Sequence, residues 1–484
     1  MNNEIVLRQL YLWNDWWVSG SVPKNKLESF ERRDLFFIKK QLEKPKILAI
    51  VGPRQVGKTT LIYQSIDFLL KEKKVDPTSI LFVNMDDQVL RLNTDNFLED
   101  ILRVYSENIL KKPIKDAKKT VFLFFDEIQT LENWNSQLKN WFDQKFNLKL
   151  VISGSSSTNI LQGSEESLAG RMYPQLVFPL KFLEVNRYNK VAKEGFMDSV
   201  NLELRYALKQ SIAEKTALPL FDELKKKKLQ LIPFEQKIQA NLNIYFIRGG
   251  YPGLLKNKET KEVESNLYNY IQATIYRDIV QLYEVRSPKK LNALIALIAQ
   301  TGIKTTSYAN LAQDLQIRIE TLESYFSYLE RAFLISEAEF YSKSINKRQR
   351  NPKKIYFHDP GIRNSLLSQV NDALLKDSTE LGLIAETVAF DHTRRLAFNL
   401  SEFKNSNLSY WKNKGEIDII LEGVKKCIPI EVKYSSDIKR KTINEVNEFA
   451  EKHKCPFGLI LTKDTLELKG NTILVPLWMY LLIC

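Results

Sequence analysis

A short apolar run followed directly by a glycine-framed loop constrains this chain most. In residues 46–51, KILAIV, a single lysine is followed by a continuous apolar run, which is typical of a buried parallel strand. The next residues, GPRQVGKT, follow the order Gly-x-x-x-x-Gly-Lys-Thr, and a helix-like segment comes after them. Glycines let backbone N–H groups turn inward, and the helix that starts there adds the positive end of its dipole. The sequence therefore predicts a loop that cradles the phosphates of a nucleotide. The residues expected to bind it are Gly52, Pro53, Arg54, Gln55, Val56, Gly57, Lys58, Thr59 and Thr60.

A second apolar run supplies the acidic partners that such a loop requires. Residues 121–125, VFLFF, are followed by Asp126 and Glu127. We expect Lys58 to reach the β- and γ-phosphates, while the hydroxyl of Thr59 and the carboxylate of Asp126 hold Mg²⁺. Glu127 would orient or deprotonate the attacking water, which favours ATP hydrolysis over nucleotide storage. The alternative is a strand that ends in the acidic cap of a helix.

Two further residues are candidates for a role near the γ-phosphate. Ser155 follows the apolar run 148–153, where it could sense that phosphate or belong to an ordinary Gly-Ser turn. Arg171, in the segment LAGR, could act as an arginine finger on the nucleotide of its own chain or of a neighbouring chain. The alternative for Arg171 is a salt bridge at the surface.

Strand-like and helix-like segments alternate along the first part of the chain, which predicts a three-layer α/β domain. Residues 183–290 look mostly helical. In residues 291–357, two helices separated by a short turn are followed by a two-stranded ribbon, which is the order of a winged helix. The α/β alternation returns after residue 378. The predicted segments are 1–185 (N-terminal helices and P-loop domain), 186–290 (helical region), 291–375 (winged helix) and 376–484 (C-terminal α/β domain).

Several of these segments together resemble one group of archaeal and bacterial AAA+ ATPases, in which a P-loop module is fused to a C-terminal domain of uncharacterised function. The resemblance spans roughly residues 28–480 and implies an ATPase core, a winged-helix segment and a C-terminal fold similar to restriction endonucleases. The segments that carry it are GPRQVGKTT, VFLFFDEIQ, ISGSSS, SLAGR, the Pro-Leu at 179–180, RGGYPGLL (248–255), TIYRDIV (274–280), KIYFHDPGIRN (354–364), EIDIIL and PIEVK.

Charged residues in the C-terminal part follow a pattern that suits phosphodiester chemistry. Asp418 lies in a strand-like run, and Glu431 and Lys433 come at the end of the next run. Residues two apart in a strand point to one face, and Asp418 can lie beside Glu431 and Lys433 if the strands pair. Two carboxylates and a lysine can hold Mg²⁺ and activate water. We expect Asp418 and Glu431 to bind the metal and Lys433 to position or deprotonate the nucleophile.

This order of residues resembles the PD-(D/E)xK nuclease signature. Families with that fold often add a glutamate from the preceding helix, and Glu386 stands where that residue is expected. The four residues together resemble archaeal Holliday-junction resolvases in pattern, although Asp418 is preceded by isoleucine rather than proline. The alternatives are a strand pair with ordinary exposed charges, or a nuclease-like domain that is retained for binding alone.

The charge balance is basic. Lys plus Arg number 71 and Asp plus Glu 58, so the net charge is +13, which suits an anionic partner such as DNA but is also compatible with a general lysine bias. A basic loop in the ribbon could track a DNA backbone as the wing of a winged helix. Glutamates in the preceding helix argue against sequence-specific reading, so structure-specific binding is expected. The loop residues expected to contact DNA are Lys343, Lys347, Arg348, Arg350, Lys353 and Lys354.

Several classes of protein are excluded by composition. The three cysteines and three histidines form neither a CxxC nor an HxxxH pair, so a zinc finger or a disulfide framework is not expected. The first residues lack the pattern of a signal peptide, and the apolar run near residue 480 contains Pro476 and is too short to span a bilayer. A cytoplasmic location without a membrane partner is therefore expected.

These observations predict an Mg²⁺- and ATP-dependent ATPase that acts on DNA, with a nuclease-like C-terminal domain and branched or junction DNA as its substrate by analogy. The alternative is a nucleotide-controlled switch of a defence or signalling kind, whose C-terminal domain binds nucleic acid without cutting it. The oligomeric state is left open, and a homo-oligomer is one possibility.

Overall fold

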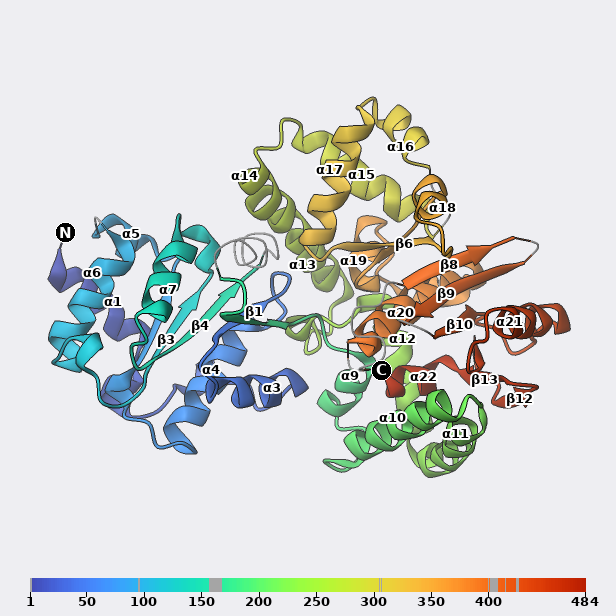
Figure 1. The fold of residues 1–484 in the computed structure, drawn as a ribbon, viewed down its shortest axis with the longest axis horizontal. Coiled ribbons are helices and arrows are strands. Elements are labelled where there is room, and N and C mark those ends of the chain that lie inside the picture. Colours follow the sequence, from blue (N-terminus) through green and yellow to red (C-terminus); the bar gives the residue numbers. More distant parts are fainter. Residues whose placement is uncertain are drawn as a thin grey trace. The chain divides into compact units, whose positions relative to one another are not determined.

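A computed structural model describes residues 2–94, 96–155, 168–303, 305, 307–398, 400, 408–413, 415–423 and 426–484. The chain divides into two compact units. Unit 1 comprises the chain up to Phe178 together with Arg331–Phe333, and unit 2 comprises Pro179–Glu330 and Leu334–Cys484. Each unit has its own sheet, and the two units are described separately below (Figure 1).

Unit 1 is built on a five-stranded sheet in which neighbouring strands run parallel. Both faces are buried, so β1 buries each of its residues, which explains its continuous apolar run. Because parallel strands end at the same edge, the loops after β1, β3 and β4 lie together. The strands, in spatial order, are β2 (Ile80–Asn84), β3 (Val121–Asp126), β4 (Leu148–Gly154), β1 (Ile47–Val51) and β5 (Met172–Leu176).

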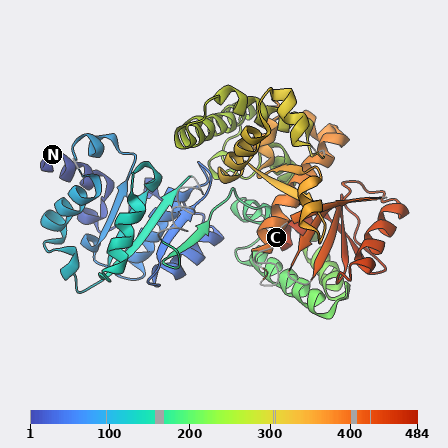
Figure 2. The ribbon, with the colours of Figure 1, turned by 45° about the horizontal axis from the view of Figure 1, so that its top comes forward.

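Helices cover both faces of this sheet (Figures 1 and 2). On one face, Leu10, Ile101 and Leu138 pack with alternate strand residues in one apolar core. On the other face, α4 starts directly after the glycine loop and packs beside α3. The α/β domain with a parallel sheet that the sequence predicts is thus confirmed. The helices of unit 1 are α1 (Asn3–Trp13), α2 (Trp16–Ser19), α3 (Arg33–Leu42), α4 (Lys58–Lys71), α5 (Gln88–Leu92), α6 (Phe97–Tyr105) and α7 (Trp134–Asp143).

Unit 2 begins with helices and continues into a second sheet. A π-helical turn at Thr274–Ile279 joins two of its helices. The helices up to the sheet are α9 (Phe182–Tyr188), α10 (Phe196–Glu214), α11 (Leu218–Leu231), α12 (Glu235–Arg248), α13 (Thr260–Ala273), α14 (Val280–Tyr283), α15 (Pro288–Thr301), α16 (Tyr308–Leu315) and α17 (Ile319–Arg331). Those within the sheet region are α18 (Ile345–Arg350), α19 (Pro360–Leu366), α20 (Ser378–Ala397), α21 (Arg440–Lys452) and α22 (Leu477–Ile483).

The sheet of unit 2 has eight strands of mixed direction. Strands β8, β9 and β10 form an antiparallel meander, and β10, β11 and β13 run parallel to their neighbours in turn. The strands, in spatial order, are β12 (Glu467–Lys469), β13 (Thr472–Pro476), β11 (Gly458–Thr462), β10 (Cys427–Val432), β9 (Glu416–Glu422), β8 (Leu408–Lys412), β6 (Ile335–Phe340) and β7 (Lys354–Phe357).

The ribbon expected to be a wing is the end of this same sheet. Strand β6 pairs antiparallel with β7 and parallel with β8 through Glu339 and Phe340. The ribbon therefore brings residues of the 291–375 segment beside strands of the 376–484 segment. A winged-helix role for the preceding helices stays a prediction. Among the helices of the described chain, none is both long and apolar enough to pass through a lipid bilayer.

Candidate functional site

The loop between β1 and α4 has the backbone that a phosphate cradle requires. Gly57 has φ of 92° and Gln55 has φ of 62°, so the chain turns through the left-handed region twice before α4 begins at Lys58. Gly52 lies so close to the next strand that an added Cβ would stand 1.8 Å from the carbonyl oxygen of Val177. The first glycine is thus required by packing and the second by conformation.

Lys58 lies inside this loop. Its Nζ donates to the carbonyl oxygens of Gly52 and Pro53 at 3.0 and 2.9 Å, and its side chain is buried. The ammonium is therefore held over the centre of the loop by the backbone that also presents the N–H groups. An anionic phosphate is the natural partner for a cation enclosed in this way.

Thr59 and Asp126 meet across the sheet edge. The Thr59 hydroxyl donates to Asp126 Oδ2 at 2.7 Å, and the hydroxyl of Ser153 donates to the other carboxylate oxygen. Burial and the nearby Glu127 raise the pKa of Asp126, while the hydrogen bonds and Lys58 oppose that shift. A hydroxyl and a carboxylate are hard oxygen ligands, and Mg²⁺ on a nucleotide takes its other ligands from phosphates and water. These residues fit such an ion.

Glu127 lies beside them, and its carboxylate is held by Gln129, a residue that the sequence interpretation missed. The backbone of Glu127 has φ of 55°, and its N–H donates to Ser153 Oγ at 3.3 Å. Gln129 Nε2 donates both to Glu127 Oε2 at 2.5 Å and to Ser155 Oγ at 3.2 Å. Ser155, expected near the γ-phosphate, is therefore linked to the expected general base through Gln129. The position of Gln129, two residues after Glu127, is the one signal in the sequence that could have indicated its role.

Arg32 binds the backbone of the loop and was not singled out in the sequence. Its guanidinium donates to the carbonyl of Val56 at 2.6 Å and to that of Phe178 at 2.7 Å, and Asp34 lies 3.1 Å away. The contact fixes the loop against the segment that follows β5. Nothing in the local sequence around Arg32 distinguishes it from other arginines.

Arg171 lies at the opposite edge of the sheet. It precedes β5, and its carbonyl accepts from the N–H of Ile47 at the start of β1, whereas the glycine loop follows the end of β1. Its guanidinium forms two hydrogen bonds with Asp143, at 2.8 and 3.2 Å. A five-residue strand separates the two edges by about 16 Å, so the geometry does not suit an arginine finger acting within the same chain. A role on a neighbouring chain stays a prediction.

Unit 2 brings together the four residues of the nuclease-like pattern. Asp418 on β9 and Glu431 on β10 are buried, and Glu431 Oε2 accepts from the N–H of Asp418 at 3.1 Å. Lys433 Nζ lies 2.6 Å from Glu431 Oε1, and both residues line a pocket of about 330 Å³. Glu386 approaches from α20.

A fifth residue, Lys354 on β7, joins Glu386 to Asp418. Its Nζ donates to Glu386 Oε1 at 3.1 Å and to Asp418 Oδ1 at 2.9 Å. Glu416 Oε1 is 3.0 Å from the same atom, and Tyr356 donates to Glu386 Oε1 at 2.7 Å. The sequence interpretation placed Lys354 among the DNA-contacting loop residues, but its side chain is 3% exposed. Lys354 is therefore a member of the carboxylate cluster and does not lie on a surface that could meet a DNA backbone.

The pKa values in this cluster follow from burial and from the mutual charges. Burial and the nearby Asp418 raise the pKa of Glu386 to about 7. Burial works against ionisation of Asp418, but Lys354 and Lys433 hold its pKa below the usual value. Although burial alone would lower it, the anionic neighbours of Lys354 keep its pKa above that of an ordinary lysine. Asp418 and Lys354 thus form a buried ion pair.

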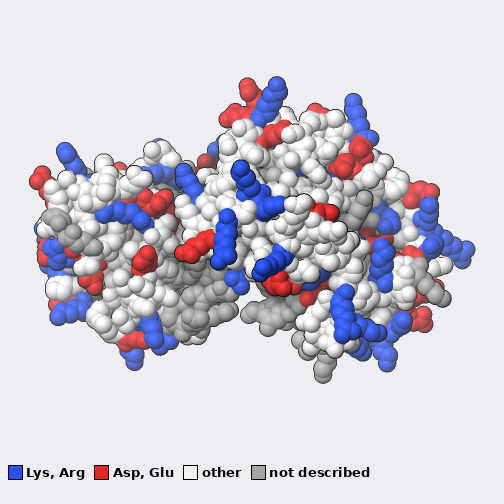
Figure 3. Space-filling view, turned by 90° about the horizontal axis from the view of Figure 1, so that it is seen from above, with Lys and Arg blue, Asp and Glu red and all other residues white. Residues whose placement is uncertain are grey.

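Of the other five basic residues in this loop, two are paired with glutamates and three have exposed side chains. Arg348 is bound by Glu422 on β9, and Lys353 lies 2.6 Å from Glu337 on β6. The remaining three side chains, those of Lys343, Lys347 and Arg350, are exposed. On the face that Figure 3 shows, Lys and Arg are interspersed with Asp and Glu. The loop thus retains three exposed cations for an anionic partner.

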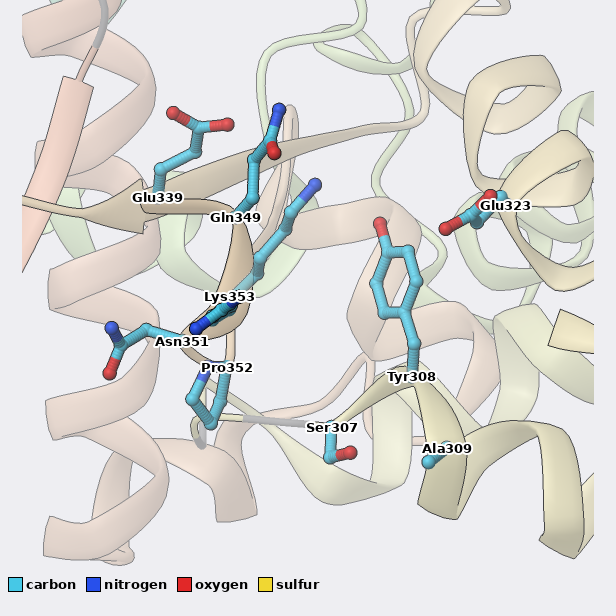
Figure 4. Close-up of a pocket in the computed structure, with 10 residues that line it drawn as sticks. Ser307, Tyr308, Ala309, Glu323, Glu339, Gln349, Asn351, Pro352 and Lys353 are labelled. Atoms are coloured by element: carbon cyan, nitrogen blue, oxygen red, sulfur yellow. The ribbon is translucent and has the colours of Figure 1, made fainter. Parts of the chain in front are cut away.

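A pocket of about 520 Å³ adjoins this loop. Figure 4 shows Tyr308 and Glu323, from α16 and α17, on one side of it, and Asn351, Pro352 and Glu339 on the other. Lys353 Nζ lies 5.1 Å from the centre of the Tyr308 ring. The pocket therefore carries an aromatic ring and charges of both signs.

Comparisons with known proteins support the assignment of unit 1 and leave unit 2 without an assigned activity. Residues 44–186 match the model of the AAA domain family. Residues 239–373 and 381–480 match two domains of unknown function, DUF8612 and DUF4143. The glycine loop, Asp126 and Glu127 all lie within the AAA domain match, which supports an ATPase domain of AAA type.

Relatives extend over nearly the whole chain. An uncharacterized protein of Methanocaldococcus jannaschii, MJ1637, is 27% identical over 437 residues, which cover 90% of this chain and 84% of that protein. A second from the same organism, MJ1544, is 28% identical and covers 84% of this chain and 77% of its own length. Among solved structures, a Walker-type ATPase of Pyrococcus abyssi aligns over 70% of this chain and 96% of its own, with a TM-score of 0.38 and 15% identity. A likeness at that level carries no functional argument.

Proposed function

We propose that this chain hydrolyses ATP in the loop between β1 and α4. The observation that carries the proposal is the meeting of Lys58, Thr59 and Asp126 at one sheet edge, with Lys58 enclosed by loop carbonyls and Thr59 bonded to Asp126 at 2.7 Å. The N-terminus of α4 and the loop N–H groups would bind the β-phosphate, and Lys58 would turn from its carbonyl partners to the γ-phosphate. Bound Mg²⁺ would neutralise charge on the phosphates as the transition state forms.

Glu127 is the residue proposed to receive the proton of the attacking water. Gln129 holds its carboxylate and reaches Ser155 as well, so that both side chains are positioned together. A base held in this way loses less orientational freedom in the transition state than a free carboxylate would. Ser155 is proposed to contact the γ-phosphate.

The ATPase assignment can be tested with two variants and a matched control. Lys58→Ala should lower ATP turnover by about 100-fold or more, because it removes a charge from the transition state. Glu127→Gln should lower turnover similarly and still bind ATP. Lys71→Ala changes an exposed lysine on the same helix and should leave turnover unchanged. Normal turnover in both site variants would remove the assignment.

We propose further that unit 2 binds DNA through the exposed cations on and beside α18. The net charge of +13 and the exposure of Lys343, Lys347 and Arg350 support this. The triple variant K343E/K347E/R350E should weaken binding to labelled linear, forked and four-way DNA, and should reduce the slope of log affinity against log salt by about 2–3. An unchanged slope would reject this surface. The control K225E/K226E/K228E reverses as many charges on α11 and should bind as the wild type does.

The action of unit 2 on DNA has two candidates. The convergence of Asp418, Glu431 and Lys433 supports a nuclease-like arrangement, for which branched or junction DNA is the proposed substrate. If it cuts, Glu431→Ala and Lys433→Ala should abolish cleavage and spare ATP turnover. If the wild type leaves linear, forked and four-way DNA intact with Mg²⁺ and ATP present, unit 2 is a binding module under nucleotide control. The contacts of Lys354 favour this second candidate.

A further inference from the structure

The ammonium of Lys354 occupies the centre of the carboxylate cluster. Its three neighbours are Asp418 Oδ1 at 2.9 Å, Glu386 Oε1 at 3.1 Å and Glu416 Oε1 at 3.0 Å. An ammonium has three N–H donors and no acceptor, so three carboxylate oxygens saturate it. The side chain is enclosed, with the ring of Tyr410 5.7 Å away. A cation at this point is therefore already supplied by the chain.

Three further carboxylate oxygens of the cluster are engaged by donors of the protein. Asp418 Oδ2 accepts from the N–H of Val432 at 3.1 Å. The two oxygens of Glu431 lie 3.1 Å from the N–H of Asp418 and 2.6 Å from Nζ of Lys433. Glu386 Oε1 accepts from Tyr356 in addition to Lys354.

A divalent metal does not fit this arrangement. Mg²⁺ requires near-octahedral oxygen ligands at about 2.1 Å. An ion bound by Asp418 Oδ1 and Glu386 Oε1 would have to stand where the ammonium of Lys354 stands, because both oxygens face it. Within the described residues, no group of three or more His, Cys, Asp or Glu side chains is arranged to hold a metal ion.

We infer that Lys354 takes the place of a divalent cation in the nuclease-like cluster, so that unit 2 holds DNA without cutting it. The inference rests on the proposal that unit 2 is a nuclease-like DNA-binding unit. A lysine in this role neutralises the buried carboxylates permanently, whereas a metal would do so only when bound. Its cost is the loss of the Lewis acid that phosphodiester hydrolysis would use.

Manganese binding to the nucleotide-free chain tests the inference. Electron paramagnetic resonance reports free Mn²⁺, whose signal falls when the ion binds. The wild type and Asp418→Asn should bind the same amount of Mn²⁺, since the cluster takes no metal in either. Lys354→Met keeps most of the length of the side chain and removes its charge, and it should gain one Mn²⁺ per chain. The double variant K354M/D418N should lose that site again. Lys353→Met, one residue away and paired with Glu337, should bind as the wild type does.

Two results of the Mn²⁺ measurement would overturn the inference. One is a wild-type Mn²⁺ site that Asp418→Asn removes, and this comparison does not depend on whether Lys354→Met folds. The other is a folded Lys354→Met that gains no metal. If Lys354→Met is destabilised, Mg²⁺ should raise its melting temperature by roughly 2–4 °C and leave that of the wild type unchanged; a destabilised variant that Mg²⁺ does not stabilise would also contradict the proposal.

The same protein preparations separate this inference from the proposed function. DNA binding is measured by fluorescence anisotropy and ATP turnover by phosphate release. A wild type that binds DNA and also a metal at Asp418 would refute the role of Lys354 and leave DNA binding intact. A wild type that binds neither DNA nor metal would refute the proposed function of unit 2 and leave the cation role of Lys354 standing.

Discussion

At the scale of single residues, the first glycine of the loop has no room for a side chain. A Cβ on Gly52 would stand 1.8 Å from the Val177 carbonyl oxygen, and Val177 is itself bound to Val51 through its N–H at 2.8 Å. We therefore expect Gly52→Ala to shift the loop away from the strand, to destabilise unit 1 by about 1–3 kcal/mol and to weaken ATP binding at least tenfold. Urea unfolding and the fluorescence of a labelled nucleotide would measure both effects.

Gly382→Ala is the matched control, because nothing lies within 4 Å of the Cβ it would add. It lies in α20, where alanine is the better helix former, so its stability should be unchanged or higher by up to about 1 kcal/mol. Wild-type ATP affinity in Gly52→Ala would mean that the Val177 carbonyl can move aside, and would contradict the packing argument.

The residues that could be predicted are those within a recognisable local pattern. Thr59 and Asp126 were expected to hold one Mg²⁺ ion together, and the structure brings the Thr59 hydroxyl to 2.7 Å from Asp126 Oδ2. Lys354 could not be placed in this way. It lies 64 residues before Asp418 in a basic segment, and its strand β7 is separated in the sheet by two strands from β9, which carries Asp418. Local charge predicted a surface lysine where long-range packing makes a buried one.

At the scale of elements, α20 serves both the carboxylate cluster and the packing of unit 2. It carries Glu386 and, further along, His392, whose Nε2 accepts from the N–H of Phe182 at 3.1 Å while Nδ1 donates to Val388 O at 2.9 Å. This pattern requires a neutral imidazole. Burial, with the nearby Arg395, lowers the pKa of His392 to about 3. The ring thus fixes α20 to α9 only while it is uncharged.

The pH dependence of stability follows from that shift. Between about pH 6.5 and pH 3, the unfolded chain binds a proton at His392 that the folded chain does not, so the free energy of unfolding should fall as the pH falls through this window. The contribution is about 1.4 kcal/mol for each pH unit. The non-titrating His392→Gln should show a shallower slope in urea unfolding between pH 6 and pH 4. An equal slope in the variant would contradict the assignment, and His453→Gln, whose ring is only partly buried, should change the slope less.

Strands buried on both faces could be predicted well, because a short continuous apolar run between turn residues is typical of such a strand. The runs expected at 46–51 and 148–153 correspond to β1 (Ile47–Val51) and β4 (Leu148–Gly154). Strand β5 was not expected, because its residues are only partly buried and their sequence shows no apolar run. The parallel pairing of β6 with β8 also had no local signal, since it depends on two residues at the end of each strand.

At the scale of the whole molecule, the chain consists of two compact units with separate sheets, each with its own candidate site. Near the end of the first unit, the sequence indicated a change in secondary structure, from alternating strands and helices to helices alone. It gave no sign that Arg331–Phe333 packs with the first unit, where Phe178 and Phe333 meet edge to face at 5.5 Å between ring centres. Such a contact joins residues far apart in the chain and leaves no local pattern.

This division predicts that a nucleotide stabilises unit 1 selectively. Five of the seven tryptophans lie in unit 1, at positions 13, 16, 17, 134 and 141, so tryptophan fluorescence reports mainly on its unfolding. Mg²⁺ and ADP at about 100 times the dissociation constant contribute about 2.7 kcal/mol, which should raise that transition by roughly 5–10 °C. The increase should be absent in Lys58→Ala, because its loop lacks the cation that meets the phosphates, and present in Glu127→Gln, which loses a catalytic group but no phosphate contact. Hydrogen exchange measured by mass spectrometry would locate the stabilisation, with protection expected in peptides that span 46–60 and 121–130. A rise in melting temperature that persists in Lys58→Ala would place the nucleotide elsewhere in the molecule.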